Sequence, residues 1–172
     1  VDPFKRAAKE IPFHVKDTRE VREAVRYQQV VAPESFDVRQ LRWVNVAPKG
    51  DKVVYSALGH LYLRKLPDGE PKRLTRQGDH FEYFPKFSRD GQRVVFATWD
   101  DEKLGSIRTI DLKSGKETTL TDAPGKYIQP VFTPDGKEVV YVKDGGSYLT
   151  SPWHGLEQGV YRVAANGKGK PV

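Results

Sequence analysis

An internal repeat is the feature of this 172-residue chain that most restricts what it can fold into. Three segments, residues 46–55, 87–96 and 132–141, share one pattern: a short apolar stretch, a turn that contains glycine, and a stretch rich in β-branched residues. The turn glycines are spaced by 41 and then 45 residues. Self-similarity at such a period indicates a repeat architecture, in which each repeat is one supersecondary unit.

Each repeat is interpreted as four short strands. The Asp-Gly or Lys-Gly turn suits a positive φ and joins the first two strands. A third strand follows, then a second glycine turn, then a fourth strand, and Leu74, Leu120 and Val172 each stand five residues after the glycine of that second turn. Four short strands in about 40–45 residues predict a propeller blade. A β-sandwich or an antiparallel meander with similar turns is the alternative.

The fold class that follows is all-β: a partial β-propeller of about three four-stranded antiparallel blades, near residues 36–78, 79–124 and 125–172, with an extended N-terminal segment. Residues 1–35 match no whole blade. Apolar side chains alternate over residues 11–15, which predicts that this segment completes a neighbouring blade. Because a ring needs about four to eight blades, we expect the chain to be a fragment of a larger propeller.

The repeat turns resemble those of a known family. The turn at residues 133–136 reads Thr-Pro-Asp-Gly, residues 88–91 read Ser-Arg-Asp-Gly, and residues 47–50 read Ala-Pro-Lys-Gly. With the later glycine turn that ends in Leu-Thr, they resemble the WD40-like (PD40) repeats of TolB-like β-propellers. The resemblance covers roughly residues 36–172.

Finer similarities point to one branch of that class. Residues 57–62, 66–69 and 99–101 resemble the N-terminal propeller region of bacterial amidohydrolase-related proteins, where it precedes a metal-dependent hydrolase domain. The resemblance implies a non-catalytic scaffold or protein-interaction module that flanks an amidohydrolase domain, in a periplasmic or secreted protein. The alternatives are the propeller part of a prolyl oligopeptidase-like serine peptidase and a periplasmic TolB-type binding protein.

Residue patterns for catalysis are absent from the sequence itself. A metal-dependent amidohydrolase needs a His-x-His pair, whereas His14, His60, His80 and His154 stand far apart, and the chain has no cysteine. Residues 145–148 do not have the Gly-x-Ser-x-Gly spacing of a serine nucleophile. We therefore assign no catalytic, metal or cofactor residue to this chain, and we interpret the acidic run at residues 100–102 as a solvated hairpin loop.

Protein partners are expected instead: the remaining blades and a catalytic domain of the same chain, or a second copy. The formal net charge is +6, but the cations are scattered among acids rather than clustered, so nucleic acid is not expected. No stretch reaches the roughly 18 apolar residues of a membrane helix, so no membrane partner is expected either.

The candidate interaction segment is residues 143–158, which is longer than the equivalent connections in the other repeats. It carries Tyr148, Trp153 and His154. Aromatic side chains on an inserted loop favour protein docking, and the alternative is a loop folded over its own blade.

Overall fold

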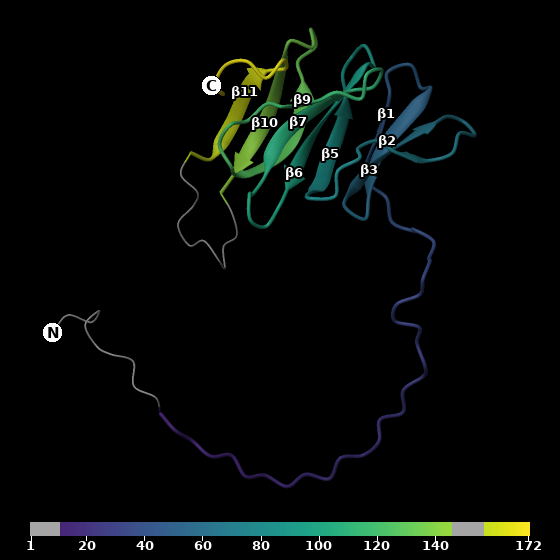
Figure 1. Cartoon of the computed structure of the whole chain (residues 1–172), viewed down its shortest axis with the longest axis vertical. Coiled ribbons are helices and arrows are strands. Elements are labelled where there is room, and N and C mark those ends of the chain that lie inside the picture. Colours follow the sequence, from purple (N-terminus) through teal and green to yellow (C-terminus); the bar gives the residue numbers. More distant parts are fainter. Residues whose placement is uncertain (1–10, 146–156) are drawn as a thin grey trace, which may run out of the picture. The chain divides into compact units, whose positions relative to one another are not determined.

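The computed structural model describes residues 11–145 and 157–172, which fall into two units divided between Phe36 and Asp37. Residues 11–36 contain neither helix nor strand, and their side chains are exposed. The idea that this segment completes a neighbouring blade stays a prediction. Every strand belongs to the second unit (Figure 1).

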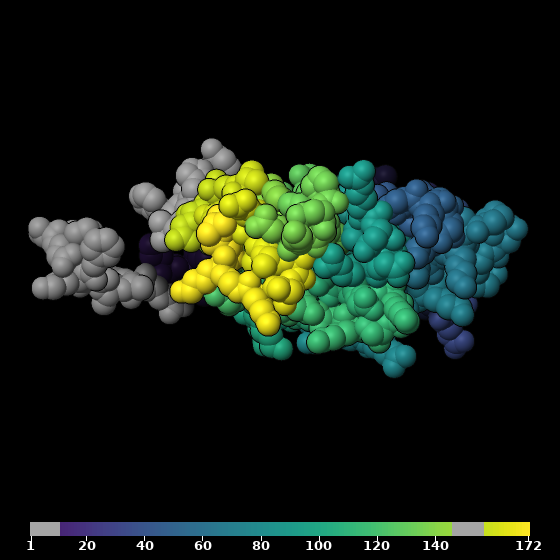
Figure 2. Space-filling model, turned by 90° about the horizontal axis from the view of Figure 1, so that it is seen from above, coloured from purple at the N-terminus to yellow at the C-terminus, as the bar shows by residue number. Residues whose placement is uncertain are grey.

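The second unit consists of three antiparallel sheets, here called blades 1 to 3, which confirms the all-β partial propeller. They lie side by side in chain order (Figures 1 and 2). Blade 1 contains β1 (Arg42–Val46), β2 (Lys52–Ala57), β3 (His60–Lys65) and β4 (Lys72–Arg73). Blade 2 contains β5 (Phe81–Phe87), β6 (Arg93–Trp99), β7 (Ser106–Asp111) and β8 (Glu117–Thr119). Blade 3 contains β9 (Lys126–Phe132), β10 (Glu138–Asp144) and β11 (Gly159–Ala164).

Blade 3 has three named strands where four were predicted, and the beginning of a fourth is visible as one residue pair. Val172 and Arg162 exchange two backbone hydrogen bonds, of 2.9 and 3.0 Å. This pair has the register of Leu63 with Lys72 in blade 1 and of Thr109 with Thr118 in blade 2. Val172 therefore takes the strand position of Lys72 and Thr118, which lies two residues before that of Leu74 and Leu120, with which its spacing from the turn glycine had aligned it.

Apolar packing between sheets holds the blades together. Because side chains alternate along a strand, β6 presents Val94 and Phe96 to blade 1 and Val95 and Ala97 to blade 3. All four side chains are fully buried. Two clusters result: the first joins blades 1 and 2 through Val54, Leu61, Val94, Phe96 and Ile110, and the second joins blades 2 and 3 through Val95, Ala97, Ile107, Leu120, Tyr127, Val139, Tyr141, Val163 and Ala165.

The repeat turns are closed by local hydrogen bonds. Ser88 donates its hydroxyl proton to Asp90 (2.6 Å), and the amide of Gly91 donates to the carbonyl of Ser88 (2.8 Å). The Ser88 hydrogen bond is the largest of the effects that lower the pKa of Asp90. The glycines of the three turns have φ between 68° and 70°, a region that costs other residues strain.

The turn glycine Gly50 allows a clean test of this strain. A Cβ added to Gly50 meets no atom within 4 Å, and the same holds for Gly78, but only Gly50 has a positive φ (+70°). We expect Gly50→Ala to lower the free energy of unfolding by about 1 kcal/mol. Gly78→Ala, the matched control, should leave it unchanged or raise it slightly. Urea denaturation followed by circular dichroism measures both; equal effects of the two variants would contradict the strain argument.

Candidate functional site

The aromatic and histidine residues singled out in the interaction segment, Tyr148, Trp153 and His154, lie outside the described residues. Within the described residues, several surface concavities lie around the end of β6, at Thr98 and Trp99. Three concavities meet there, and we call the whole region the β6-end surface.

The three concavities differ in chemistry. The polar cavity, about 320 Å³, lies beside Thr98, Ser106 and Arg108. The acidic cavity, about 290 Å³, lies beside Asp100, Asp101 and Glu102. The aromatic cavity, about 270 Å³, is lined almost entirely by apolar atoms. The cavities adjoin one another, since each pair shares lining residues. Thr98 lines both the polar and the aromatic cavity, and Trp99 lines both the aromatic and the acidic cavity. The polar and acidic cavities share Asp79, His80 and Asp100.

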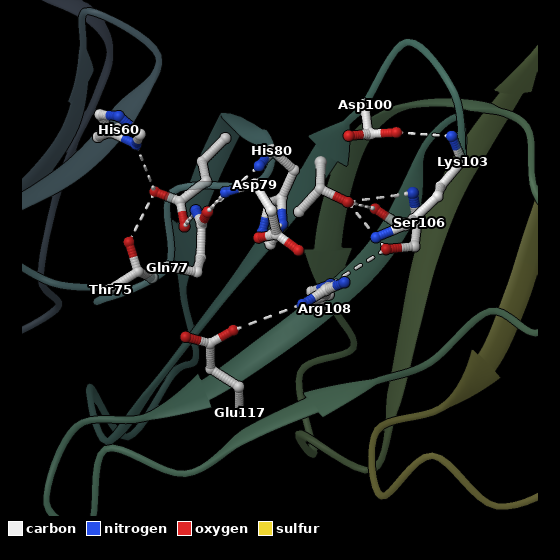
Figure 3. Close-up of polar contacts among 12 residues, drawn as sticks. His60, Thr75, Gln77, Asp79, His80, Asp100, Lys103, Ser106, Arg108 and Glu117 are labelled. Carbon is white, nitrogen blue, oxygen red and sulfur yellow. Dashed lines mark hydrogen bonds and ion pairs between the residues drawn. The ribbon is translucent and has the colours of Figure 1, made fainter.

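A buried carboxylate positions the residues of this surface. Glu82, on β5, has no exposed area. Its Oε2 accepts hydrogen bonds from the amide of Leu61 and the hydroxyl of Thr75, each at 2.8 Å, and its Oε1 accepts one from the side-chain amide of Gln77 at 2.7 Å (Figure 3). Leu61 belongs to blade 1, and Thr75 and Gln77 belong to the segment that follows it, so Glu82 fastens the first strand of blade 2 to blade 1.

Gln77, which is held by Glu82, in turn binds the backbone of the residues that follow it. Its side-chain oxygen accepts hydrogen bonds from the backbone amides of Asp79 (3.1 Å) and His80 (3.3 Å). This holds the turn that leads into β5. The network could not be predicted from the sequence because Glu82 and Leu61 are 21 residues apart.

His80 is a buried histidine of this surface that is paired with a carboxylate. It is 5% exposed, and its Nδ1 lies 2.9 Å from a carboxylate oxygen of Asp79 (Figure 3). Burial, and then the positive charge of Arg108, lowers the pKa of His80 below its ordinary value. A hydrogen bond from its own backbone amide is the largest effect that lowers the pKa of Asp79. At neutral pH a neutral imidazole therefore donates its Nδ1 proton to an ionised carboxylate.

This assignment leaves the other ring nitrogen without a partner. Nε2 of His80 is buried and makes no hydrogen bond to any described residue. In the tautomer that donates from Nδ1, Nε2 carries a lone pair and can only accept. A buried acceptor without a donor is costly, and His80 lines both the polar and the acidic cavity. From the sequence, His80 was interpreted as a surface or packing histidine, and its pairing with Asp79 was not predicted.

Three polar side chains that line the polar cavity, those of Thr98, Ser106 and Arg108, form hydrogen bonds with one another. The hydroxyls of Thr98 and Ser106 lie 2.8 Å apart, and Nε of Arg108 donates to the Ser106 hydroxyl at 3.2 Å. Arg108 also lies 3.8 Å from a carboxylate oxygen of Glu117, whose pKa burial raises. The Arg108 charge is therefore shared between partners of its own blade.

The acidic run forms the turn between β6 and β7, where the sequence predicted a hairpin loop. A carboxylate oxygen of Asp100 accepts hydrogen bonds from the backbone amides of Glu102 (2.9 Å) and Lys103 (2.6 Å), and these bonds lower the pKa of Asp100. Asp101 accepts a hydrogen bond from the indole nitrogen of Trp99 at 2.8 Å. The turn thus presents ionised carboxylates at the rim of the surface.

Bulges in the innermost strands create the aromatic cavity. Trp43, Phe84 and Gln129 have φ of 50°, 54° and 53°, each beside a break in strand register. Each residue stands seven positions before the turn glycine of its repeat. The Trp43 and Phe84 rings lie 4.5 Å apart, and Tyr83 meets Trp43 edge-on at 5.4 Å. The identical offset was the signal in the sequence that could have revealed these positions.

Residues 11–145 and 157–172 contain no group of three or more His, Asp or Glu side chains arranged to hold a metal ion. This part of the chain also contains no helix with the length and hydropathy needed to cross a membrane.

Comparison with known proteins identifies the fold. No family model matches the chain. It is 29% identical over 123 residues to the Tol-Pal system protein TolB of Francisella tularensis subsp. holarctica (strain OSU18), a match that covers 70% of this chain and 27% of that protein. The chain thus spans about a quarter of the length of the curated relatives that it matches.

Solved structures of similar fold support the same identification of the fold. TolB from Acinetobacter baumannii superposes with a TM-score of 0.59 and 23% identity, over 76% of this chain and 31% of that one. An oligogalacturonate lyase in complex with manganese superposes with a TM-score of 0.60 and 15% identity, over 74% of this chain and 38% of that one. With the three antiparallel sheets, these similarities show a TolB-like β-propeller fold.

Loss of the buried carboxylate should destabilise the chain. In Glu82→Gln one acceptor oxygen becomes a donor that faces donors, so we expect the free energy of unfolding to fall by about 3 kcal/mol. Chemical denaturation at pH 7 measures it. Glu117→Gln, which alters a half-buried carboxylate on the outermost strand of blade 2, is the control and should change it by less than about 1 kcal/mol. Equal losses in the two variants would contradict the fastening role of Glu82.

The protonation of His80 can be measured directly. We expect its imidazole to titrate below about pH 6.5, the ordinary value, with Nε2 as the unprotonated nitrogen. The Asp79 charge raises the pKa of His80, so Asp79→Asn should lower that pKa further. Because the folded-state pKa is depressed, the contribution of His80 to stability is fully present above the unfolded pKa of about 6.5 and is lost at lower pH, as the pH falls through the folded-state pKa. Long-range ¹H–¹⁵N NMR gives both pKa and tautomer, and titration above pH 6.5 would contradict this account.

Proposed function

We propose that this chain is a non-catalytic part of a larger TolB-like propeller, where it acts as a scaffold or protein-interaction module, and that it flanks a metal-dependent amidohydrolase domain in the full-length protein. The first part of the proposal rests on the outer face of blade 3 and on the β6-end surface. The amidohydrolase association rests on the sequence resemblance alone.

The outer face of blade 3 supports a larger assembly. Val160 is the register equivalent of Ile107, which packs between blades 2 and 3. In blade 3, where the described residues contain no further blade, Val160 is 71% exposed and Val131 is 42% exposed. A face of this kind, used for inter-blade packing in one repeat and uncovered in the next, favours contact with a further blade or a second copy.

Two alternatives compete with this proposal. One is a periplasmic TolB-type binding protein, which the similarity to a Tol-Pal system protein supports. The other is the propeller part of a prolyl oligopeptidase-like serine peptidase, which rests on the fold class. We also propose a periplasmic or secreted location, which is what the resemblance to TolB-like proteins implies.

Self-association tests the role of the outer face. We expect the isolated 172-residue chain to self-associate, and Val160→Lys to reduce the associated fraction because a charge resists burial in an apolar contact. Static light scattering over a concentration series measures it. Val30→Lys, at an 81% exposed valine of the other unit, is the control. A monomer at all concentrations would contradict the need for a covering partner.

Crosslinking in the producing cell tests the interaction role and separates the alternatives. A photo-reactive amino acid that replaces Trp99 of this numbering in the full-length protein should crosslink to residues of the same polypeptide outside the propeller if a catalytic domain docks there. Crosslinks to a separate protein would favour the TolB-type binding protein. Labelling of the full-length protein by a serine-reactive fluorophosphonate would favour the peptidase. Absence of any crosslink at this position would count against the interaction role.

A further inference from the structure

We propose that the β6-end surface binds a segment of a protein partner in which an apolar or aromatic side chain stands next to a lysine or arginine. This inference rests on the proposed interaction role and specifies the chemistry of the partner.

The aromatic cavity is suited to one large side chain. Its volume of about 270 Å³ lies just below the range of roughly 300–1,000 Å³ typical of small-molecule pockets. Its lining includes four residues from the first strands of the blades and one from β6: Trp43, Tyr83, Phe84, Ile128 and Trp99. Binding energy at protein interfaces is concentrated in such apolar pockets, which receive a single anchoring side chain.

The bulged backbone directs aromatic rings to this cavity. A positive φ is unfavourable for a residue other than glycine, yet all three inner strands adopt it at the same repeat position. Trp43 and Phe84 line the aromatic cavity, whereas the third blade has Gln129 at this position, which does not line it. The backbone feature therefore repeats, while the aromatic side chains occur only where the cavity lies.

The neighbouring cavities complement a cation. Four carboxylates, those of Asp79, Asp100, Asp101 and Glu102, line the acidic cavity. The cations of the polar cavity are Lys103 and Arg108, and Arg108 is already engaged by Glu117 and Ser106. The unpartnered Nε2 of His80 requires a hydrogen-bond donor. An ammonium or guanidinium group supplies both the positive charge and the N–H donors, whereas an anion would face the carboxylates.

Because the cavities adjoin one another, one ligand can place an apolar side chain in the aromatic cavity and a cation beside the carboxylates. Trp99 borders both the aromatic and the acidic cavity, and Thr98 borders both the aromatic and the polar cavity. A side chain in the aromatic cavity therefore places the next residue of an extended peptide beside the carboxylates. A free amine would satisfy only the acidic side, so the apolar neighbour distinguishes a peptide from a small cation.

Peptide binding tests the proposal with the whole 172-residue chain. The probe is an acetylated and amidated hexapeptide with phenylalanine followed by lysine in a glycine–serine background, carrying a neutral fluorophore for anisotropy. Replacement of its lysine by glutamate should weaken binding at least about tenfold because the carboxylates then repel it. Replacement of its phenylalanine by serine should weaken binding by a similar factor through loss of the anchor.

Protein variants localise the binding to the surface. Trp43→Gly removes the indole and suits the positive φ, so the fold is retained and we expect about tenfold weaker binding. Gln129→Gly makes the same backbone change outside the cavity and should leave affinity unchanged. Asp100→Asn should weaken binding about fivefold. Asp111→Asn is its matched control, because Asp111 accepts the equivalent backbone amides, of Lys113 and Ser114, in the next turn.

The outcomes separate this inference from the proposed function. Equal binding of the lysine and glutamate peptides, or equal effects of Trp43→Gly and Gln129→Gly, would overturn the partner chemistry. If no peptide binds while the position 99 crosslinks persist, the partner chemistry fails and the interaction role stands. If the peptide binds as expected while those crosslinks are absent, the site is supported and the docking of a catalytic domain against it fails.

Discussion

The structure around the β6-end surface depends on one buried carboxylate. Glu82 accepts hydrogen bonds from three donors that belong to blade 1 and to the segment leading into β5. A carboxylate without exposed area is tolerated only when its oxygens are satisfied. Blade 2 must therefore meet blade 1 at the angle that satisfies them. Since Gln77 is one of the three donors and also binds the amide of His80, the same constraint places the imidazole at the cavities.

At the junction of blades 2 and 3, the backbone amide equivalent to that of Leu61 is satisfied by a hydroxyl instead of a carboxylate. Tyr127 stands at the repeat position of Glu82, and the amide of Ile107, equivalent to that of Leu61, donates instead to the hydroxyl of Thr121 at 3.0 Å. The Tyr127 hydroxyl donates to the carbonyl of Ala123. Both junctions thus satisfy the amide of the second residue in the third strand of a blade. Only the first uses a charge, and its polar network explains why the unpartnered histidine occurs at blade 2.

The sequence predicted the parts of this fold that depend on local chemistry. Turn glycines with positive φ and alternation along β6 are visible in single segments, so the three sheets and their stacking followed from the repeat. The candidate site could not be predicted in this way, because Asp79 and His80 acquire their roles through Glu82 and Gln77 across the blade junction. The bulge at Trp43 and Phe84 depends on strand pairing, which residue type alone does not reveal.

The net charge of the chain was a poor guide to its surface for a related reason. The formal charge of +6 counts all residues equally, whereas the field at a cavity depends on which charges lie within several ångströms and how well they are screened. At the β6-end surface the turn geometry fixes Asp100 through two backbone amides, while Arg108 is drawn toward Glu117 and Ser106. An acidic patch on a basic protein thus arises from turn formation, and it favours cationic groups locally although the chain as a whole repels them.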